Sequence, residues 1–393
     1  MVRMTRRDVL AGAGALAAWG GRGLSGQATG VHFNVAEFDR ARILAVADEG
    51  MGGSLLVLAS VEAPGTRDPQ RFFCDAMLDS AGDVSGFTGH ADLLGRMAAR
   101  VAALAAAWRL TADDKYLQRA RAQMRAWCIV PETRMLPTLE NVAAARAVDA
   151  AAEGAKSDPD LRSNPLRFTL PLAEFARAAS FVCAAAATPA EEADAIRAWV
   201  NELLKWFNES ERGVVAREST RADSIFWTMQ ASELARFARN DAVWRECGHR
   251  FRDKLLRQLH LDGYFAYALT TQRPYAESML LLECMGSACE SVSTPFESAW
   301  GFSLADGRGM RPAVAWAFPF LQSRGKWPYP ADVRRFSRQP LRENVLLFGG
   351  RAWNRQDYVD QWKAMKPADG ADAAIKREHS VTQPALWAVR APA

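Results

Sequence analysis

Apolar side chains recur at three- and four-residue steps through most of this chain. Leu94, Met97, Val101 and Trp108 mark one face of a helix, and the same spacing predicts a second helix over 116–127. Further pairs of helices are expected over 172–186 with 196–207, 222–238 with 241–260, and 275–291 with 309–322. Tandem helices joined by short turns predict an all-α chain built from stacked antiparallel hairpins.

Two short apolar stretches interrupt this helical pattern. They are SLLVLASV at 54–61 and NVLLFGG at 344–350. A short apolar run bounded by loop residues is typical of a strand, so we expect strands at both places. They do not alter the fold class.

The net charge argues against one class of partner. The formal charge of the 393 residues is +4, and most of this excess lies in the first 28 residues, which hold Arg3, Arg6, Arg7 and Arg22 against Asp8. The remainder is nearly neutral and carries no reason to expect nucleic acid as a partner.

The N-terminus has the layout of an export signal. Paired arginines in TRRDVL precede the short apolar run VLAGAGALAAW, and the small residues Gly26 and Ala28 offer a cleavage site. We expect residues 1–28 to be a twin-arginine signal peptide and the mature protein to be periplasmic or secreted; a disordered basic tail is the other interpretation. The apolar run is too short to span a bilayer, so no stable membrane insertion is expected after its removal.

Cysteine and histidine spacing gives no sign of a bound metal. The six cysteines form no CxxC pair, and most lie in apolar helical patterns, where a free cysteine behaves as a small hydrophobe. The five histidines are scattered. We expect neither a metal nor a cofactor, and the disulfide state remains open.

Several stretches carry a resemblance to a known family, and they occur in the same order as in that family. They are LTADDKYLQRARAQMRAWCIVPETRMLPTL at 110–139, IRAWVNELLKWF at 196–207, FWTMQASELARF at 226–237, LDGYFAYALTTQRPYAESMLLLE at 261–283 and WPY at 327–329. Over roughly 90–330 the chain resembles the alginate-lyase family of polysaccharide lyases. The resemblance implies one α/α-toroid domain, an incomplete α/α barrel of helical hairpins, over 29–393, with an irregular tail at about 367–393.

The resemblance also implies an activity. Members of the family cleave polyuronates by β-elimination, in which the C5 proton becomes acidic once the uronate carboxylate is neutralised. An Asn–His pair at the start of a helix and a nearby arginine carry out this step, and a tyrosine transfers a proton at the glycosidic oxygen. The expected partner is therefore an acidic polysaccharide or oligosaccharide.

Two of the family's catalytic positions hold other residues in this chain. When the segment is aligned on Gln230 and Phe237, Ala222 stands in place of the asparagine and Asp223 in place of the histidine. An aspartate at this position repels a uronate carboxylate, by roughly 1 to 4 kcal/mol at about 4 Å. Asp223 is therefore either catalytic or a helix cap or ion-pair partner.

The tyrosine position can be read in two registers. Alignment on Glu283 places Arg273 on a family arginine and Glu277 on the tyrosine, whereas a two-residue shift places Tyr275 there. The candidate catalytic residues are therefore Tyr275, Arg273, Asp223 and Glu277. Glu277 as a solvated charge on a helix face is the competing interpretation.

Five further residues are candidates for substrate binding. Arg134 in the PETRMLPTL loop and Arg221 near Asp223 offer guanidinium groups for a polyanion. Trp227, Tyr264 and Tyr267 offer aromatic faces for pyranose rings, although aromatic residues at helical spacing are more often part of a core.

Three functions are compatible with these residues. The first is a lyase that uses Tyr275 as acid/base and Arg273 as carboxylate clamp. The second is a glycoside hydrolase in which Asp223 and Glu277 supply the two carboxylates. The third is a non-catalytic saccharide binder with a degenerate site.

Overall fold

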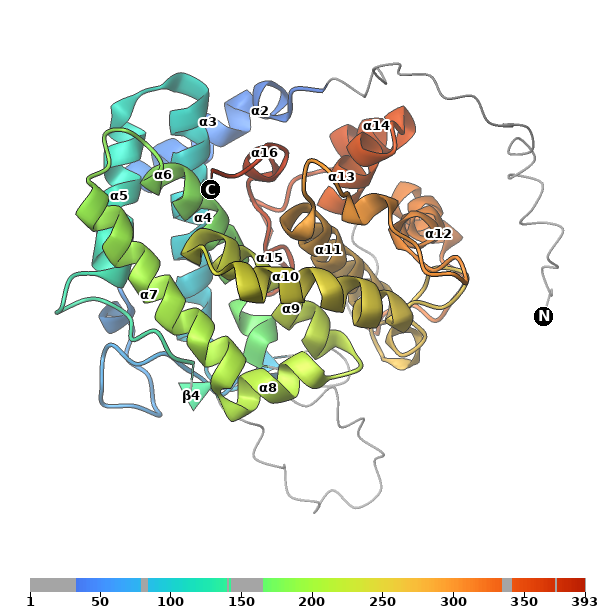
Figure 1. Cartoon of the computed structure of the whole chain (residues 1–393), viewed down its shortest axis with the longest axis horizontal. Helices are drawn as coiled ribbons and strands as arrows, with labels where there is room; N and C mark the ends of the chain where they lie inside the picture. The colour runs from blue at the N-terminus through green and yellow to red at the C-terminus, as the bar shows by residue number, and fades with distance from the viewer. Residues whose placement is uncertain are drawn as a thin grey trace, which may run out of the picture.

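The structure is a computed structural model that describes residues 33–78, 84–139, 141–142, 165–333, 341–371 and 373–392. The expected signal peptide, residues 1–28, lies outside the described residues. Helices make up most of the described part and are arranged in two layers (Figure 1).

The inner layer consists of long helices, each in contact with the next around an incomplete ring. They are α4 (Gly89–Thr111), α6 (Pro171–Cys183), α9 (Ala222–Ala238), α11 (Pro274–Val292) and α13 (Asn344–Ala352). Neighbours surround these helices, so even polar residues in them are buried: every residue from Ser224 to Ala235 of α9 is buried. Such a helix shows little amphipathic pattern.

The outer layer consists of amphipathic helices. They are α3 (Arg40–Met51), α5 (Asp114–Cys128), α7 (Ala190–Glu209), α10 (Asp241–Arg250), α12 (Met310–Gln322) and α14 (Gln356–Ala364). In α7, for example, Ile196, Leu203 and Phe207 are buried while Glu202 and Lys205 are exposed. The two layers form the expected α/α-toroid, and the predicted hairpin pairs are confirmed.

Shorter elements connect the layers. The helices are α2 (Val35–Phe38), α8 (Glu211–Glu218), α15 (Ala373–Glu378) and α16 (Pro384–Trp387), and the helical turns are η1 (Leu58–Ser60), η3 (Pro165–Thr169), η4 (Phe251–Leu255), η5 (Leu256–Gln258), η6 (Ala268–Thr270), η7 (Ala299–Gly301) and η8 (Arg324–Lys326). Among the described residues, β1 (Phe73–Cys74) pairs in parallel with β4 (Asn141–Val142), and β2 (Met77–Leu78) pairs antiparallel with β3 (Val84–Ser85).

Both predicted strands are wrong. Residues 344–350 lie in α13, whose first backbone N–H groups, those of Asn344 and Val345, donate to the Glu283 carboxylate at 3.1 and 2.9 Å. At 54–61 the chain is a loop with the turn η1, and Leu56 forms both of its backbone hydrogen bonds with the Gln123 side chain. A continuous apolar run indicates burial but cannot separate a buried helix or loop from a strand.

The C-terminal segment, residues 373–392, packs inside the ring and is more ordered than the expected irregular tail. It contains α15 and α16, which lie between α4 and the α11–α13 side in Figure 1. The buried Arg177 of α6 donates to the carbonyls of Leu386, Trp387 and Val389. These bonds satisfy backbone groups that burial would otherwise leave without partners.

The six cysteines all lie in the described part and are free. None of the helices described has the length and apolar character needed to cross a bilayer. In the same residues, no cluster of histidine, cysteine and acidic side chains is grouped as metal ligands would be.

Candidate active site

The N-terminal ends of neighbouring inner helices meet on one side of the ring. Arg167, in the turn η3 just before α6, is bonded to Glu277 in the first turn of α11. The Arg167 guanidinium also lies 5.8 Å from the ring centroid of Phe226 on α9. The starts of α6, α9 and α11 therefore come together, and the N-termini of helices favour anions through their free N–H groups and dipoles.

Four charged residues at this place form one ion-pair network. Arg167 holds Glu277 through two parallel bonds of 3.0 and 2.9 Å, and its Nη2 lies 3.4 Å from Oε1 of Glu378 on α15. The same Oε1 accepts a hydrogen bond from Nη2 of Arg273. All four side chains are mostly buried, and their charges cancel. Burial acts to raise the pKa of Glu378, but Arg273 and Arg167 outweigh it and hold this pKa below its usual value.

Buried polar contacts fix the two arginines in place. Gln230 of α9 donates from Nε2 to the Leu166 carbonyl at 3.0 Å and accepts from the Thr169 hydroxyl at 2.8 Å, which ties η3 to α9 on both sides of Arg167. Arg273 is the residue before α11, and its backbone N–H donates to Oγ1 of Thr271. The network is therefore held by the scaffold and not only by its own charges.

Tyr275 lies in the first turn of α11 and is 3 % exposed. Its backbone N–H donates to Asp332 Oδ1 at 2.8 Å, while the Arg324 guanidinium lies 4.5 Å from its ring centroid and Trp327 packs edge-on at 5.1 Å. Burial raises the pKa of Tyr275 to about 12, with Arg324 opposing the shift. The phenol is therefore protonated at neutral pH and holds a transferable proton, although the raised pKa makes it a weaker acid than an exposed tyrosine.

The start of α9 carries a second polar group of residues. Arg221 precedes α9, and its guanidinium lies 5.8 Å from the ring centroid of Tyr267. The Tyr267 hydroxyl donates to Gln258 Oε1 at 3.1 Å, and Gln258 Nε2 donates to Oγ of Ser224 in the first turn of α9 at 2.9 Å. Asp223 lies half-buried in the same turn. The structure thus brings Arg221, Asp223 and Tyr267 to one helix end.

The remaining aromatic and basic candidates are placed differently. Tyr264 is half-buried, stacks on His260 at 4.3 Å and lies 5.9 Å from Trp316, so it joins an aromatic group with a partly exposed face. Trp227 is fully buried and its indole N–H donates to the Phe207 carbonyl, which makes it part of the core and not the sugar platform expected from the sequence. The side chain of Arg134 is exposed on a loop that backbone and indole hydrogen bonds tie to α5 and α7.

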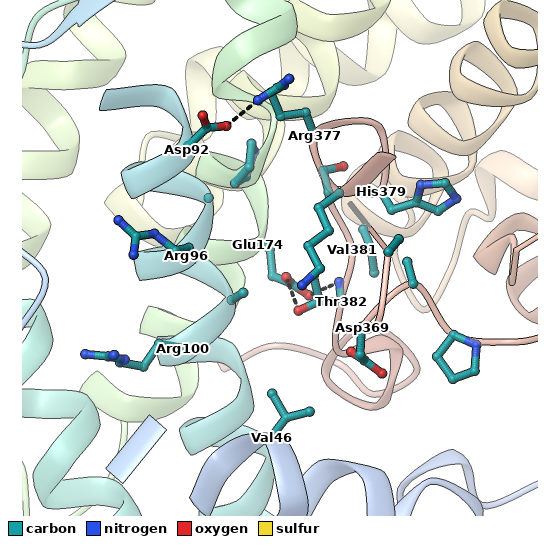
Figure 2. A pocket seen from close by; sticks show the side chains of 18 of the residues that line it. Val46, Asp92, Arg96, Arg100, Glu174, Asp369, Arg377, His379, Val381 and Thr382 are labelled. Atoms are coloured by element: carbon teal, nitrogen blue, oxygen red, sulfur yellow. Dashed lines mark hydrogen bonds and ion pairs between the residues drawn. The ribbon is translucent and has the colours of Figure 1, made fainter. Parts of the chain in front are cut away.

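A cavity of about 530 Å³ lies between α3, α4, residues 367–371 and residues 376–384 of the C-terminal segment (Figure 2). Six cationic side chains and four carboxylates line it, namely Arg42, Arg96, Arg100, Arg342, Lys376 and Arg377 with Glu49, Asp92, Glu174 and Asp369. Of the cations, Arg96 and Lys376 are exposed, and Arg100 donates only to the Ser54 carbonyl and the Gln123 amide oxygen. Among the described residues these three have no carboxylate partner, so the cavity is suited to an anionic ligand.

Sequence reasoning missed Arg167, Glu378, Arg324 and Asp332. Arg167 and Glu378 belong to no recognisable motif, and each lies more than 100 positions from its partner, Glu277 on α11 or Arg273 just before it. Asp332 was detectable in principle, because an aspartate is a common partner of free N–H groups at the start of a helix, but it lies 57 positions after Tyr275.

Comparison with known proteins agrees with this architecture. The family model of alginate lyase matches residues 80–327. The structure is similar to an alginate lyase from Bacteroides ovatus, with a TM-score of 0.69 and 16 % identity over 88 % of this chain and 96 % of that one. It is also similar to a variant of alginate lyase A1-III complexed with a tetrasaccharide, with a TM-score of 0.55 and 14 % identity over 85 % and 91 %.

Alginate lyase A1-III from Sphingomonas species A1 gives a TM-score of 0.52 and 13 % identity over 85 % of this chain and 92 % of that one. No curated protein sequence gives a significant match. The fold and the matched region together define an α/α-toroid of the polysaccharide-lyase class. The chain belongs to the alginate-lyase family.

Proposed function

We propose that the protein is a lyase that cleaves a uronate-containing polysaccharide by β-elimination. The observation that carries the proposal is the position of Arg273, whose guanidinium holds a carboxylate, that of Glu378, at the start of α11. A uronate carboxylate bound in the same way would lose much of its charge, and the C5 proton next to it would become acidic. The solved relatives are alginate lyases, so alginate is the first polymer to test.

The two proton transfers are assigned to Asp223 and Tyr275. Asp223 stands where the family has its histidine, and as a half-buried carboxylate it is the candidate to accept the C5 proton. Tyr275, with a pKa of about 12, is the candidate to donate a proton to the glycosidic oxygen. Arg221, two residues before Asp223, offsets the repulsion between Asp223 and the substrate carboxylate.

The hydrolase alternative is less well supported. It needs Glu277 as one of two working carboxylates, but both of its oxygens accept hydrogen bonds from Arg167. A carboxylate held in this way has no oxygen free to activate water or to protonate a leaving group.

We also propose that the protein is exported by the twin-arginine route and acts in the periplasm or outside the cell. The support is the pair Arg6 and Arg7 before a short apolar run. Replacing both arginines by lysine should retain the precursor in the cytoplasm. Undiminished periplasmic protein after that change would refute this route.

The product distinguishes the proposed function from its alternatives. β-Elimination leaves a C4–C5 double bond that absorbs in the ultraviolet, whereas hydrolysis gives reducing ends without that absorbance. Incubation with alginate, glucuronan and other polyuronates should therefore yield unsaturated ends. Reducing ends without ultraviolet absorbance would favour the hydrolase, and saccharide binding with no product would favour the binder.

A further inference from the structure

Glu378 lies between the guanidinium groups of Arg167 and Arg273, and one of its oxygens contacts both. We propose that Arg167 and Arg273 together form the binding site for a substrate uronate carboxylate, and that Glu378 of the C-terminal segment occupies this site until substrate displaces it. The inference rests on the proposed function and adds to it Arg167 as a specificity-determining residue and Glu378 as an internal competitor.

The geometry of Arg167 favours this role. Its two parallel bonds to Glu277 fix the plane of the guanidinium and leave Nη2 facing Glu378 at 3.4 Å. The side chain of Arg273 has Glu378 as its only hydrogen-bond or ion-pair partner in the described part of the chain. One carboxylate therefore bridges a guanidinium held by the scaffold and a second guanidinium that has no other side-chain partner among the described residues.

The balance of charge makes Glu378 and a substrate carboxylate compete for the same two guanidinium groups. With Glu378 in place, two guanidinium groups face two carboxylates, and all are mostly buried. Withdrawal of Glu378 alone would leave a buried guanidinium without a counter-charge, which is unfavourable. A uronate carboxylate would restore the balance, whereas a neutral sugar would not. The site therefore selects for acidic saccharides.

The C-terminal segment also separates this network from the cavity. Lys376, Arg377 and His379 line the cavity, while Glu378 between them contacts Arg167 and Arg273. Phe168, next to Arg167, lines the cavity as well. A shift of this short segment would expose both guanidinium groups to a space already lined by cations.

Polar contacts hold this part of the segment, and a bound polyanion would replace the carboxylates in them. Arg377 pairs with Asp92 of α4, and Thr382 bonds to Glu174 of α6, as Figure 2 shows. Lys376 is exposed, and the side chains of Arg377, Glu378 and His379 keep 18 %, 19 % and 17 % of their surface exposed. Contacts of this kind open locally at lower cost than a packed apolar core.

The test compares two charge-matched variants, one in the C-terminal segment and one at the cavity. Glu378→Gln removes the internal competitor, whereas Asp369→Asn removes a cavity carboxylate that pairs with Arg42 at 3.2 Å and not with Arg167 or Arg273. The probes are tetramannuronate and the neutral mannotetraose, titrated by calorimetry in a Tyr275→Phe background so that the probe is not consumed.

We expect Glu378→Gln to bind tetramannuronate at least about fivefold more tightly, and Asp369→Asn to change binding by less than about twofold. Mannotetraose binding should be unaffected by either change. An equal gain in both variants would show a general charge effect and overturn the proposal. So would an unchanged affinity in Glu378→Gln.

The role of Arg167 in binding is tested with a variant that still folds. Arg167→Gln alone leaves Glu277 unpaired, so the double variant Arg167→Gln with Glu277→Gln is used, and cooperative thermal unfolding shows that it folds. It should bind tetramannuronate roughly tenfold more weakly than the parent. Unchanged binding in the folded double variant would remove Arg167 from the site.

Hydrogen exchange reports displacement directly. Backbone amides in residues 376–383 should exchange faster when tetramannuronate is bound than without it. Exchange that is unchanged or slower would contradict displacement. If Glu378→Gln tightens binding in the Tyr275→Phe background, but neither the parent protein nor Glu378→Gln with Tyr275 intact forms unsaturated product, the carboxylate site stands and the lyase proposal fails. If product forms and Glu378→Gln changes neither binding nor rate, the lyase proposal stands and the proposed displacement of Glu378 fails.

Discussion

Arg167 and Glu277, 110 residues apart in the chain, form a bidentate ion pair that joins the turn before α6 to the first turn of α11. The pair is nearly buried, with side chains 11 % and 5 % exposed. It brings together the ends of helices that the sequence presents as separate hairpins, and it places the Arg273 guanidinium beside a second cation.

The first prediction concerns this pair. Glu277→Ala leaves the Arg167 guanidinium buried with only the longer contact to Glu378, and we expect it to lower the free energy of unfolding by about 3 to 5 kcal/mol. Asp357→Ala breaks the exposed pair with Arg355, whose side chains are 48 % and 47 % exposed, and should cost less than about 1 kcal/mol. Urea denaturation measures the free energy of unfolding of both variants. Equal losses in Glu277→Ala and Asp357→Ala would contradict the burial of the Arg167–Glu277 pair.

The second prediction concerns Glu174, which accepts hydrogen bonds from Thr382 and Gln383. Burial raises its pKa to about 7 from a usual 4.5, although these bonds oppose the shift. Between these two pH values the folded protein keeps a proton that the unfolded chain has lost. The free energy of unfolding therefore falls as the pH rises through this window, by about 3 kcal/mol when complete.

Glu174→Gln should remove this contribution, because the amide can accept from the same N–H groups and donate to the Thr382 hydroxyl. Denaturation at a series of pH values should then give a shallower fall in the free energy of unfolding than in the parent. Glu49→Gln, on the exposed side of the same cavity, should keep the parent profile. An unchanged slope in Glu174→Gln would show that this carboxyl does not titrate in the window.

The third prediction concerns Asp332, whose two carboxylate oxygens accept from the backbone N–H groups of Tyr275 and Ala276 at 2.8 and 3.1 Å. Asp332→Ala should cost about 1 to 2 kcal/mol of stability as a lost helix cap. Because the cap orients the first turn of α11, kcat should fall as well, and Asp332→Asn, which keeps an acceptor for only one of the two N–H groups, should recover part of it. A loss of stability with kcat unchanged would limit Asp332 to a structural role.

The fourth prediction compares the fully buried Trp227 with the half-buried Tyr264. Trp227→Ala should lower stability by about 3 to 5 kcal/mol. Tyr264→Ala should cost clearly less stability, about 1 kcal/mol, and should weaken oligosaccharide binding by roughly two- to tenfold. Thermal unfolding and calorimetric titration of both variants test this, and the opposite pattern would reverse their assigned roles.

The fold was largely predictable, because helical spacing is a local property. The apolar steps from Leu94 to Trp108 identify α4, and those at 116–127 identify α5. The prediction failed at 344–350, where every residue is buried, because a short apolar run does not distinguish a buried helix from a strand. Trp227 was offered as a ligand contact for the same reason, since α9 is buried all around and its pattern gives no outward face.

The candidate site was predictable only where local motifs carry it. Arg273, Tyr275 and Asp223 follow from short stretches near helix starts. Arg167 and Glu378 join them through contacts that cross the ring, and no local pattern records which distant carboxylate meets which guanidinium. The burial of Glu277, expected as either a catalytic or a solvated carboxylate, follows from the same long-range pairing.

The most direct test of the central claim is the initial rate of ultraviolet absorbance from unsaturated ends with polymannuronate as substrate. We predict product with the parent protein, a loss of at least about 100-fold in kcat/KM for Arg273→Gln, and no product when the carboxyl groups of the polymer are reduced to alcohols. Thermal unfolding of Arg273→Gln confirms that the variant is folded. The same rate in Arg273→Gln, or no unsaturated product from any polyuronate with the parent protein, would contradict β-elimination at this site.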